Sequence, residues 1–194
     1  MGSKSSSKGW YRRGYHPHLD LANRTQGITF RLADSVPRKL IEKWKRELIA
    51  SPDEIRANQL RRLIASYEDA GRGQCWLRDP RNAQLVVDAL THFDRERYDL
   101  IEWCVMPNHV HVLVVIREGF LMSEMVRSWK SYTARLINQN LGQSGQVWAR
   151  NYHDRLIRDT EHLERARRYI LMNPVKAGLS KTPEDWQWSS ARSD

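Results

Sequence analysis

The spacing of apolar positions and one turn signal predict three strands in this chain. Apolar residues occupy every second position of the segment 26–32, the period of a strand with one face on a core. The segments 100–105 and 109–116 are predicted as an antiparallel pair closed by a short Pro-Asn turn. A further short strand is expected at 75–77. The pattern therefore predicts a sheet with an antiparallel pair at its centre.

A repeat of three to four residues predicts the helices. Met125, Trp129, Tyr132 and Leu136 form one stripe, which we expect to face the core. The last predicted helix begins at a cap on Asp159 or Thr160 and ends at Asn173, because the ring of the next residue, a proline, forbids continuation. The predicted helices cover residues 37–48, 53–67, 83–90, 121–141 and 160–173.

Strands interleaved with helices are typical of an α+β domain in which helices pack on a sheet. The chain has 194 residues, of which 40% are hydrophobic, enough for one ordinary core. We therefore predict a single domain over residues 10–194. Residues 1–9 are polar, serine-rich and basic, and are predicted to form a disordered arm.

The charge of the chain points to a polyanionic partner. Lys and Arg number 32 against 23 Asp and Glu, a net charge of +9, and the sequence pI is about 9.8. The excess is concentrated in residues 1–62, which hold 14 basic and 6 acidic side chains. Nucleic acid is the first expectation for a domain with such a basic segment.

Cysteine usage and hydropathy indicate a reducing compartment. Cys75 and Cys104 lie in apolar surroundings without CxxC spacing, so we expect two buried free thiols and no cysteine zinc site. The longest apolar run, residues 110–116, is far shorter than the roughly 20 residues of a membrane span. We expect a cytoplasmic protein with no membrane partner.

Two pairs of residues are candidates for chemistry. His109 and His111 are two apart in a predicted strand, so both imidazoles project from one sheet face and can share a metal ion. Tyr169 and Asn173 are four apart on a predicted helix and lie one above the other. An amide oxygen can bind a hard cation such as Mg²⁺ or Mn²⁺. The alternatives are structural histidines, a packed tyrosine and a helix C-cap, and the spacing alone leaves them open.

Several cations and aromatic rings are candidates for DNA contacts. In the N-terminal segment they alternate, as expected of a surface that binds phosphates and stacks on bases. Others lie on the polar side of the helix 121–141 or beside Tyr169. A solvated tail with ordinary surface charges is the alternative. The candidates are Trp10, Tyr11, Arg12, Arg13, Tyr15, Arg24, Arg31, Arg127, Lys130, Arg165 and Arg168.

Four strings of the sequence resemble the REP-associated tyrosine transposases, a branch of the HUH single-tyrosine transposases. They are WCVMPNHVHVLVV, SWKSYTARLIN, VWARNYHDRLIRDTEHLERARRYILMNPVKAGL and PEDWQWSS. The resemblance runs from about Gln26 to Ser190. It implies a ferredoxin-like sheet, with helices packed on it, that recognises single-stranded hairpins of repetitive extragenic palindromes.

The resemblance also implies a reaction. In that family the His-hydrophobic-His pair matches His109 and His111, the nucleophile matches Tyr169, and the polar residue that completes the metal site matches Asn173. We therefore expect a Mg²⁺- or Mn²⁺-dependent endonuclease and transposase that cleaves and rejoins DNA through a 5′-phosphotyrosine intermediate. Its domesticated members resemble monomers and its mobile members act as dimers, which favours a monomer here. Its setting would be the bacterial cytoplasm, at the nucleoid.

Other interpretations remain open at this point. A regulator could keep the fold and bind nucleic acid without cleaving it, and a hydrolase could use the histidine pair without a covalent intermediate. Tyr132 competes with Tyr169 as nucleophile, but its place on the apolar stripe favours core packing. Tyr152 lacks a ligand at helical spacing. The sequence identifies no base for the tyrosine proton, and His162 is only a candidate.

Overall fold

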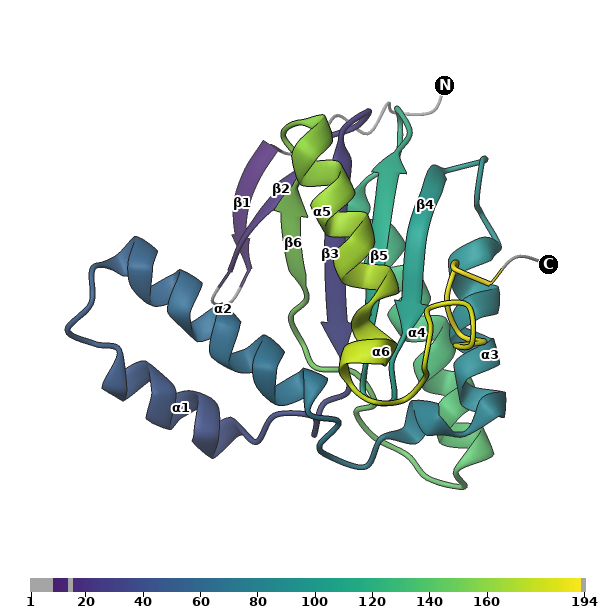
Figure 1. The fold of residues 1–194 in the computed structure, drawn as a ribbon, viewed down its shortest axis with the longest axis horizontal. Helices are drawn as coiled ribbons and strands as arrows, with labels where there is room; N and C mark the ends of the chain where they lie inside the picture. The colour runs from purple at the N-terminus through teal and green to yellow at the C-terminus, as the bar shows by residue number, and fades with distance from the viewer. Residues whose placement is uncertain (1–8, 14–15, 193–194) are drawn as a thin grey trace.

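A four-stranded antiparallel sheet with helices on both faces forms the body of the protein (Figure 1). The computed structural model describes residues 9–13 and 16–192, with side chains from residue 21 onward except that of Glu54. The strand order is β4-β5-β3-β6, and each neighbouring pair is antiparallel. The strands are β3 (Thr25–Arg31), β4 (Tyr98–Val105), β5 (His109–Ile116) and β6 (His153–Leu156). The three strands predicted at 26–32, 100–105 and 109–116 are confirmed as β3, β4 and β5, whereas the short polar β6 was not predicted.

The helices divide between the two faces of the sheet. Val110 and Val112 on β5 pack in one cluster with residues of α3 and α4, whereas Leu113 packs in a second cluster with Ile170 of α5. The order of strands and covering helices is that of the ferredoxin-like fold, which confirms the predicted class. The helices are α1 (Arg38–Glu47), α2 (Asp53–Asp69), α3 (Pro80–Thr91), α4 (Met122–Asn140), α5 (Thr160–Leu171) and α6 (Asn173–Lys176).

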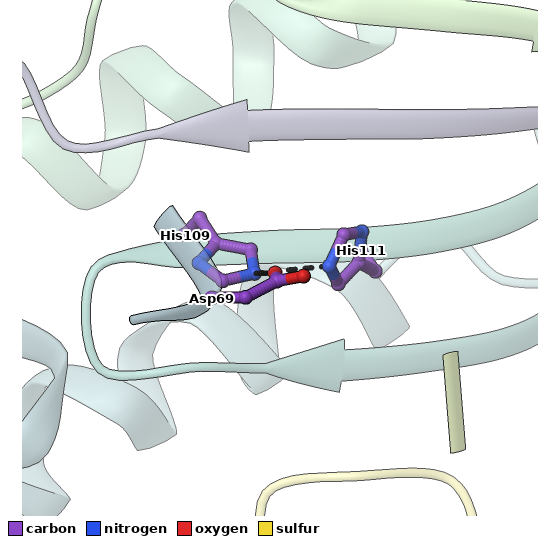
Figure 2. Close-up of side chains that lie close together, drawn as sticks. All are labelled: Asp69, His109 and His111. Atoms are coloured by element: carbon purple, nitrogen blue, oxygen red, sulfur yellow. Dashed lines mark hydrogen bonds and ion pairs between the residues drawn. The ribbon is translucent and has the colours of Figure 1, made fainter. Parts of the chain in front are cut away.

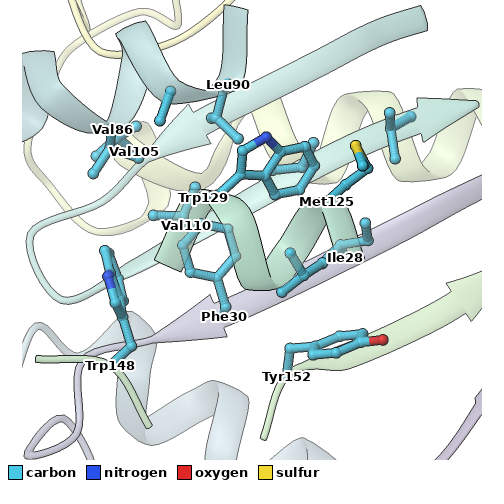
Figure 3. Close-up of a cluster of buried hydrophobic side chains, with 14 of the residues drawn as sticks. Ile28, Phe30, Val86, Leu90, Val105, Val110, Met125, Trp129, Trp148 and Tyr152 are labelled. Atoms are coloured by element: carbon cyan, nitrogen blue, oxygen red, sulfur yellow. The ribbon is translucent and has the colours of Figure 1, made fainter. Parts of the chain in front are cut away.

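Aromatic side chains fill the core between the sheet and α4 (Figure 3). Phe30 is 1% exposed, and its ring centroid lies 4.9 Å from that of Trp148 and 6.3 Å from that of Trp129. The Trp129 indole donates to the Tyr98 hydroxyl at 3.1 Å, and that hydroxyl donates to the Leu90 carbonyl at 2.7 Å. The buried indole N–H of Trp129 and the buried hydroxyl of Tyr98 are thus both paired within the core.

Truncation of Phe30 tests this account of the core. Phe30→Ala removes the ring between two indoles and is expected to lower the free energy of unfolding by about 3–5 kcal/mol. Tyr132→Ala is the matched control, because Tyr132 is 45% exposed on α4, and it should cost less than about 1 kcal/mol. Urea denaturation measures both values. Equal losses in the two variants would contradict the packing described here.

The predicted stripe of α4 was right in Met125 and Trp129 but wrong in its last two members, because Tyr132 is exposed and Leu136 is only half-buried. The buried positions are instead Met122, Met125, Val126, Trp129, Thr133 and Ile137. Thr133 is tolerated in the core because its hydroxyl donates to the Trp129 carbonyl at 2.6 Å and accepts from the Trp148 indole at 2.9 Å. Thr133, whose hydroxyl makes two hydrogen bonds, therefore occupies the buried face on which Tyr132 was predicted.

Two predicted boundaries also differ from the structure. The strand expected at 75–77 is wrong: Cys75 has a left-handed backbone, φ +52°, and a single 3-10 turn follows at Trp76–Arg78. The end of the last helix differs too. Pro174 lies in the first turn of α6, where a proline needs no N–H partner, so the chain turns at Met172 and stays helical. The predicted Asp159 cap of α5 is confirmed.

Two pairs of elements lie outside the body. β1 (Gly9–Arg13) and β2 (His16–Asp20) form an antiparallel ribbon near β6, while α1 and α2 form a helical hairpin that projects from the sheet (Figure 1). Of the arm predicted for residues 1–9, residues 1–8 lie outside the described residues, and Gly9 begins β1. Cys75 and Cys104 are buried free thiols, as predicted. No helix among the described residues is long and apolar enough to cross a membrane.

Candidate functional site

The period of β5 brings the two histidines together beneath α5. His109 and His111 are 0% and 4% exposed, and their Nε2 atoms lie 2.9 Å apart (Figure 2). They face the side of the sheet that α5 covers, whereas Val110 between them faces the opposite cluster. The prediction that both imidazoles share one face is therefore confirmed by the geometry.

The second nitrogen of each ring has a partner that orients it. His109 Nδ1 lies 2.7 Å from the amide oxygen of Asn108, and His111 Nδ1 lies 2.9 Å from the hydroxyl of Thr29. Because an amide oxygen only accepts, His109 must donate from Nδ1, which leaves a lone pair on Nε2. Such partners are the usual means by which proteins aim imidazole ligands at a metal.

Burial keeps both imidazoles neutral. It lowers the pKa of His109 well below its ordinary value, and the positive charge of His111 would lower it further. Burial also lowers the pKa of His111 to about 3, and a charge on His153 acts in the same direction. Protons therefore do not compete for these nitrogens near neutral pH, and both rings are in the form that binds metals.

The structure adds Asp69, which the sequence analysis did not single out. Asp69 is the last residue of α2, and its Oδ1 lies 3.6 Å from His109 Nε2 (Figure 2). One ligand atom from each of Asp69, His109 and His111 lies within 4.8 Å of the others. Burial raises the pKa of Asp69, while a hydrogen bond from Asn173 and the charge of Lys176 lower it. The residues around Asp69 in the sequence carry no motif that would distinguish it from a surface aspartate at the end of a helix.

Asn173 completes the cluster from the opposite side. Its side chain is 2% exposed, and its Nδ2 lies 3.1 Å from His111 Nε2. A half-turn of the amide group would exchange nitrogen for oxygen and offer a ligand atom at this place. Asn173 thus lies next to the histidine pair, as the sequence analysis expected, although its amide nitrogen and not its oxygen faces His111.

Tyr169 lies over the histidines with its ring partly open to solvent. Its ring packs edge-to-face on His111 with centroids 5.3 Å apart, and 37% of the residue is exposed. Lys176 Nζ lies 5.4 Å from the centroid of the same ring. Burial raises the pKa of Tyr169 to about 12, and the negative charge of Asp69 acts in the same direction. The hydroxyl is therefore a protonated phenol at neutral pH.

The donor set fits a divalent cation. Two neutral imidazole nitrogens, a carboxylate and an amide converge from β5, α2 and α6. Asp69 Oδ1 is buried and accepts no hydrogen bond from any described residue. A buried carboxylate oxygen without a partner suits a cation ligand. Mixed nitrogen and oxygen ligands suit Mn²⁺ and related ions, and the carboxylate and amide oxygens also suit Mg²⁺.

The competing residues lie elsewhere. Tyr152 is 8% exposed within the core cluster, and Tyr132 lies on α4, which covers the opposite face of the sheet. His162 lies in the first turn of α5, about 10 Å of helical rise from Tyr169, too far to take its proton directly. Among these residues, only Tyr169 lies beside the histidine pair.

The predicted DNA contacts divide into several groups. Trp10, Tyr11, Arg12 and Arg13 belong to β1, where only the backbone is described, and Tyr15 lies outside the described residues. Arg24, Arg127 and Arg168 are exposed, and Arg165 is exposed and paired with Glu161.

Two of the predicted DNA contacts have partners inside the protein. Arg31 forms an ion pair with Glu68 at 3.0 Å and is 18% exposed in its side chain. Lys130 donates to the carbonyls of Ala149 and Arg150, at 2.7 and 3.1 Å. These contacts give both cations a structural role.

Comparisons with known proteins point to one family of transposases. Residues 84–173 match the family model described as "Transposase IS200 like". That segment contains His109, His111, Tyr169 and Asn173, whereas Asp69 precedes it. The chain is 30% identical over 109 residues to a Haemophilus influenzae protein and 26% identical over 112 residues to an Escherichia coli K12 protein. Both are named as REP-associated tyrosine transposases.

These relatives are matched over part of their length. The matches cover 50% and 57% of this chain and 61% and 66% of the relatives. A solved structure of a REP-associated tyrosine transposase bound to a REP hairpin superposes with a TM-score of 0.56 at 20% identity. It covers 93% of this chain and 81% of its own. At that identity the likeness supports the fold alone.

Proposed function

We propose that this chain cleaves and rejoins single-stranded DNA hairpins with Tyr169 as nucleophile, because residues 84–173 match the IS200-like transposase family model and the chain is similar to two REP-associated tyrosine transposases. The observation that carries the proposal is the placement of the Tyr169 ring against His111, within the cluster of Asp69, His109 and Asn173. The structural relative bound to a REP hairpin makes a palindromic hairpin the substrate class to test.

The chain's own residues divide the work of the reaction. The Tyr169 hydroxyl oxygen attacks the scissile phosphorus, a new oxygen–phosphorus bond forms, and the bond to the 3′ oxygen breaks. The phenolic proton passes to solvent water, and the leaving 3′ oxygen takes a proton from water to become a hydroxyl. The 5′-phosphate ester on Tyr169 conserves the energy of the broken bond, so attack by a 3′-hydroxyl can reverse the step and join strands.

His109, His111, Asp69 and Asn173 would hold a divalent cation. When bound, such an ion would withdraw charge from the non-bridging oxygens of the phosphate. The protein's part is to keep the imidazoles neutral and aimed, through burial and through Asn108 and Thr29. Arg167 ties α5 to the sheet by an ion pair with Glu102 at 2.9 Å, which fixes the helix that presents Tyr169.

A cleavage assay tests the proposal. End-labelled hairpin oligonucleotides with single-stranded flanks are incubated with the protein and Mn²⁺ or Mg²⁺, then separated under denaturing conditions. We expect the fragment downstream of the cut to be linked to the protein through its 5′-phosphate, and the upstream fragment to end in a free 3′-hydroxyl. Hairpin binding without either product, across several hairpins and both ions, would overturn the enzymatic proposal and favour a non-cleaving regulator with the same fold.

The pKa of Tyr169 predicts the pH dependence of the cleavage rate. Because that pKa is raised to about 12, the phenolate fraction is very small at neutral pH and grows about tenfold for each pH unit. The rate of adduct formation should therefore increase from about pH 6.5 to about pH 9. Single-turnover kinetics at saturating hairpin measure it, with hairpin affinity determined separately at each pH. A rate that falls over this range would contradict the assignment.

A further inference from the structure

The end of α2 reaches the histidine pair through one buried side chain. Asn108, which is 0% exposed, donates from Nδ2 to the carbonyl of Glu68 at 3.1 Å and to that of Arg72 at 2.8 Å. These carbonyls flank Asp69 in the chain. The amide oxygen of the same side chain accepts from His109 Nδ1 at 2.7 Å. One amide group thus contacts both the first histidine and the segment that carries Asp69.

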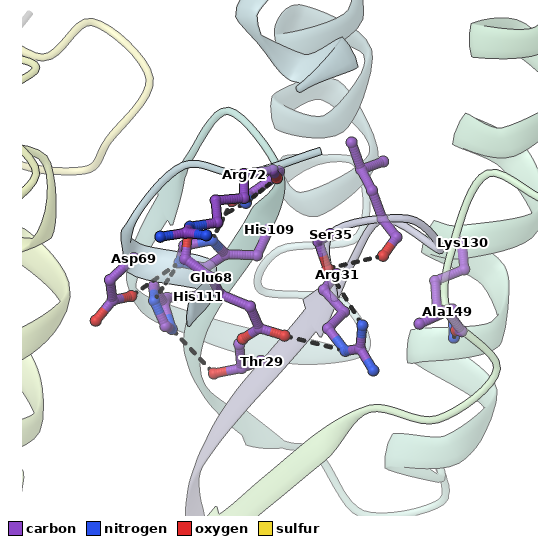
Figure 4. A network of polar contacts seen from close by, with 12 residues as sticks. Thr29, Arg31, Ser35, Glu68, Asp69, Arg72, His109, His111, Lys130 and Ala149 are labelled. Atoms are coloured by element: carbon purple, nitrogen blue, oxygen red, sulfur yellow. Dashed lines mark hydrogen bonds and ion pairs between the residues drawn. The ribbon is translucent and has the colours of Figure 1, made fainter. Parts of the chain in front are cut away.

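Two described side-chain contacts join α2 to the sheet. Beside Asp69, Glu68 pairs with Arg31 of β3 at 3.0 Å, and this carboxylate is 5% exposed (Figure 4). Farther along, Arg61 contacts His153 of β6 at 3.2 Å. At the opposite end the hairpin projects away from the sheet (Figure 1), and Ile55 is 50% exposed. The position of Asp69 therefore depends on contacts near the C-terminal end of α2.

Asn108 is well suited to control that position. Its two amide protons are directed to main-chain carbonyls, and loss of a donor to a buried carbonyl leaves that oxygen without a partner. A side chain at this place needs an acceptor for His109 and two donors for the loop. Among uncharged side chains of this size, only an asparagine offers both.

We propose that Asn108 is a positioning residue that joins the two halves of the cation site, the histidine pair of β5 and the carboxylate at the end of α2. The inference rests on the proposed function in one respect, that a divalent cation is bound here. It goes further in two ways. It assigns Asp69, which lies on α2 outside the segment that matches the family model, as a ligand. It also assigns to Asn108 the positioning of Asp69.

Asn108→Asp separates the two contacts of this side chain. The carboxylate still accepts from His109 Nδ1, and a carboxylate partner usually strengthens an imidazole ligand. It offers no amide protons to the carbonyls of Glu68 and Arg72. If Asn108 acted on His109 alone, affinity for Mn²⁺ would stay the same or increase. If it acts through α2, affinity should fall about 10- to 100-fold.

Asp69→Asn and the double variant complete the test. Calorimetric titration with Mn²⁺ in the absence of DNA should show similar losses for Asn108→Asp and Asp69→Asn, and little further loss when both are combined. Hydrogen exchange should be faster over residues 64–72 in Asn108→Asp but not in Asp69→Asn. Additive losses, or unchanged affinity in either single variant, would overturn the inference.

Exchange in the wild-type chain gives a second test that does not depend on the folding of an Asn108 variant. Mn²⁺ should slow exchange over residues 64–72 in the wild-type protein and leave it unchanged in Asp69→Asn. If the wild-type protein binds Mn²⁺ but its exchange over residues 64–72 does not change, the role given to α2 is overturned while the proposed function stands. A wild-type protein that binds no Mn²⁺ would overturn both this inference and the proposed function.

Discussion

Tyr169→Phe is expected to abolish the covalent adduct while hairpin binding is retained. The substitution removes only the hydroxyl oxygen, and the ring can keep its edge-to-face contact with His111. Loss of a nucleophile commonly lowers the rate by on the order of 10⁴-fold or more, so no adduct should be detectable on a denaturing gel. Hairpin affinity, measured by fluorescence anisotropy, should change less than about twofold, because the lost group makes up little of a largely electrostatic interface.

Tyr132→Phe is the matched control for this experiment. Tyr132 is 45% exposed, close to the 37% of Tyr169, but it lies on α4 at the opposite face of the sheet. Its variant should form the adduct at the wild-type rate. An adduct that survives in Tyr169→Phe and disappears in Tyr132→Phe would transfer the nucleophile to α4 and refute the site described here.

His109→Ala is expected to remove the metal dependence together with the activity. The variant loses a ligand nitrogen at the centre of the cluster, 2.9 Å from His111 Nε2 and 3.6 Å from Asp69 Oδ1. Loss of an outer partner of a ligand costs about 10- to 100-fold in metal affinity, and loss of the ligand itself should exceed that. We expect Mn²⁺ affinity to fall at least about 100-fold, with cleavage falling in parallel at fixed Mn²⁺.

His92→Ala serves as the control for the histidine substitution. His92 is exposed at the end of α3, so its loss should leave Mn²⁺ affinity and cleavage unchanged. EDTA should stop cleavage by the wild-type protein, and added Mn²⁺ should restore it. Cleavage by His109→Ala at the wild-type rate in EDTA would show that the histidine pair has a structural role only.

Local periodicity was sufficient to predict most of the fold. Alternation of apolar residues predicted β3, which places one row of side chains on the core beneath α4, and the Pro-Asn turn followed by a continuous apolar run predicted β5, which is buried on both faces. The same period of two placed His109 and His111 on one face. One helical turn placed Tyr169 and Asn173 together, although the chain turns at Met172 between two helices.

What the sequence could not predict depends on contacts between distant segments. Asp69 lies 40 residues before His109, at the end of a helix whose docking is decided by Asn108 and by the pair of Arg31 and Glu68. Short-range patterns carry no information on such contacts. The misplacement of Tyr132 has a related cause, because one of the two hydrogen bonds that satisfy Thr133 in the core comes from Trp148, which follows it by 15 residues.

The most direct test of the account is to map the adduct. The wild-type protein is incubated with a hairpin oligonucleotide and Mn²⁺, the protein–DNA conjugate is digested, and the nucleotide-linked peptide is sequenced by mass spectrometry. The account predicts a phosphodiester on Tyr169 that forms only with the divalent ion and is absent in EDTA. A linkage on any other residue, or one on Tyr169 that forms equally in EDTA, would contradict it.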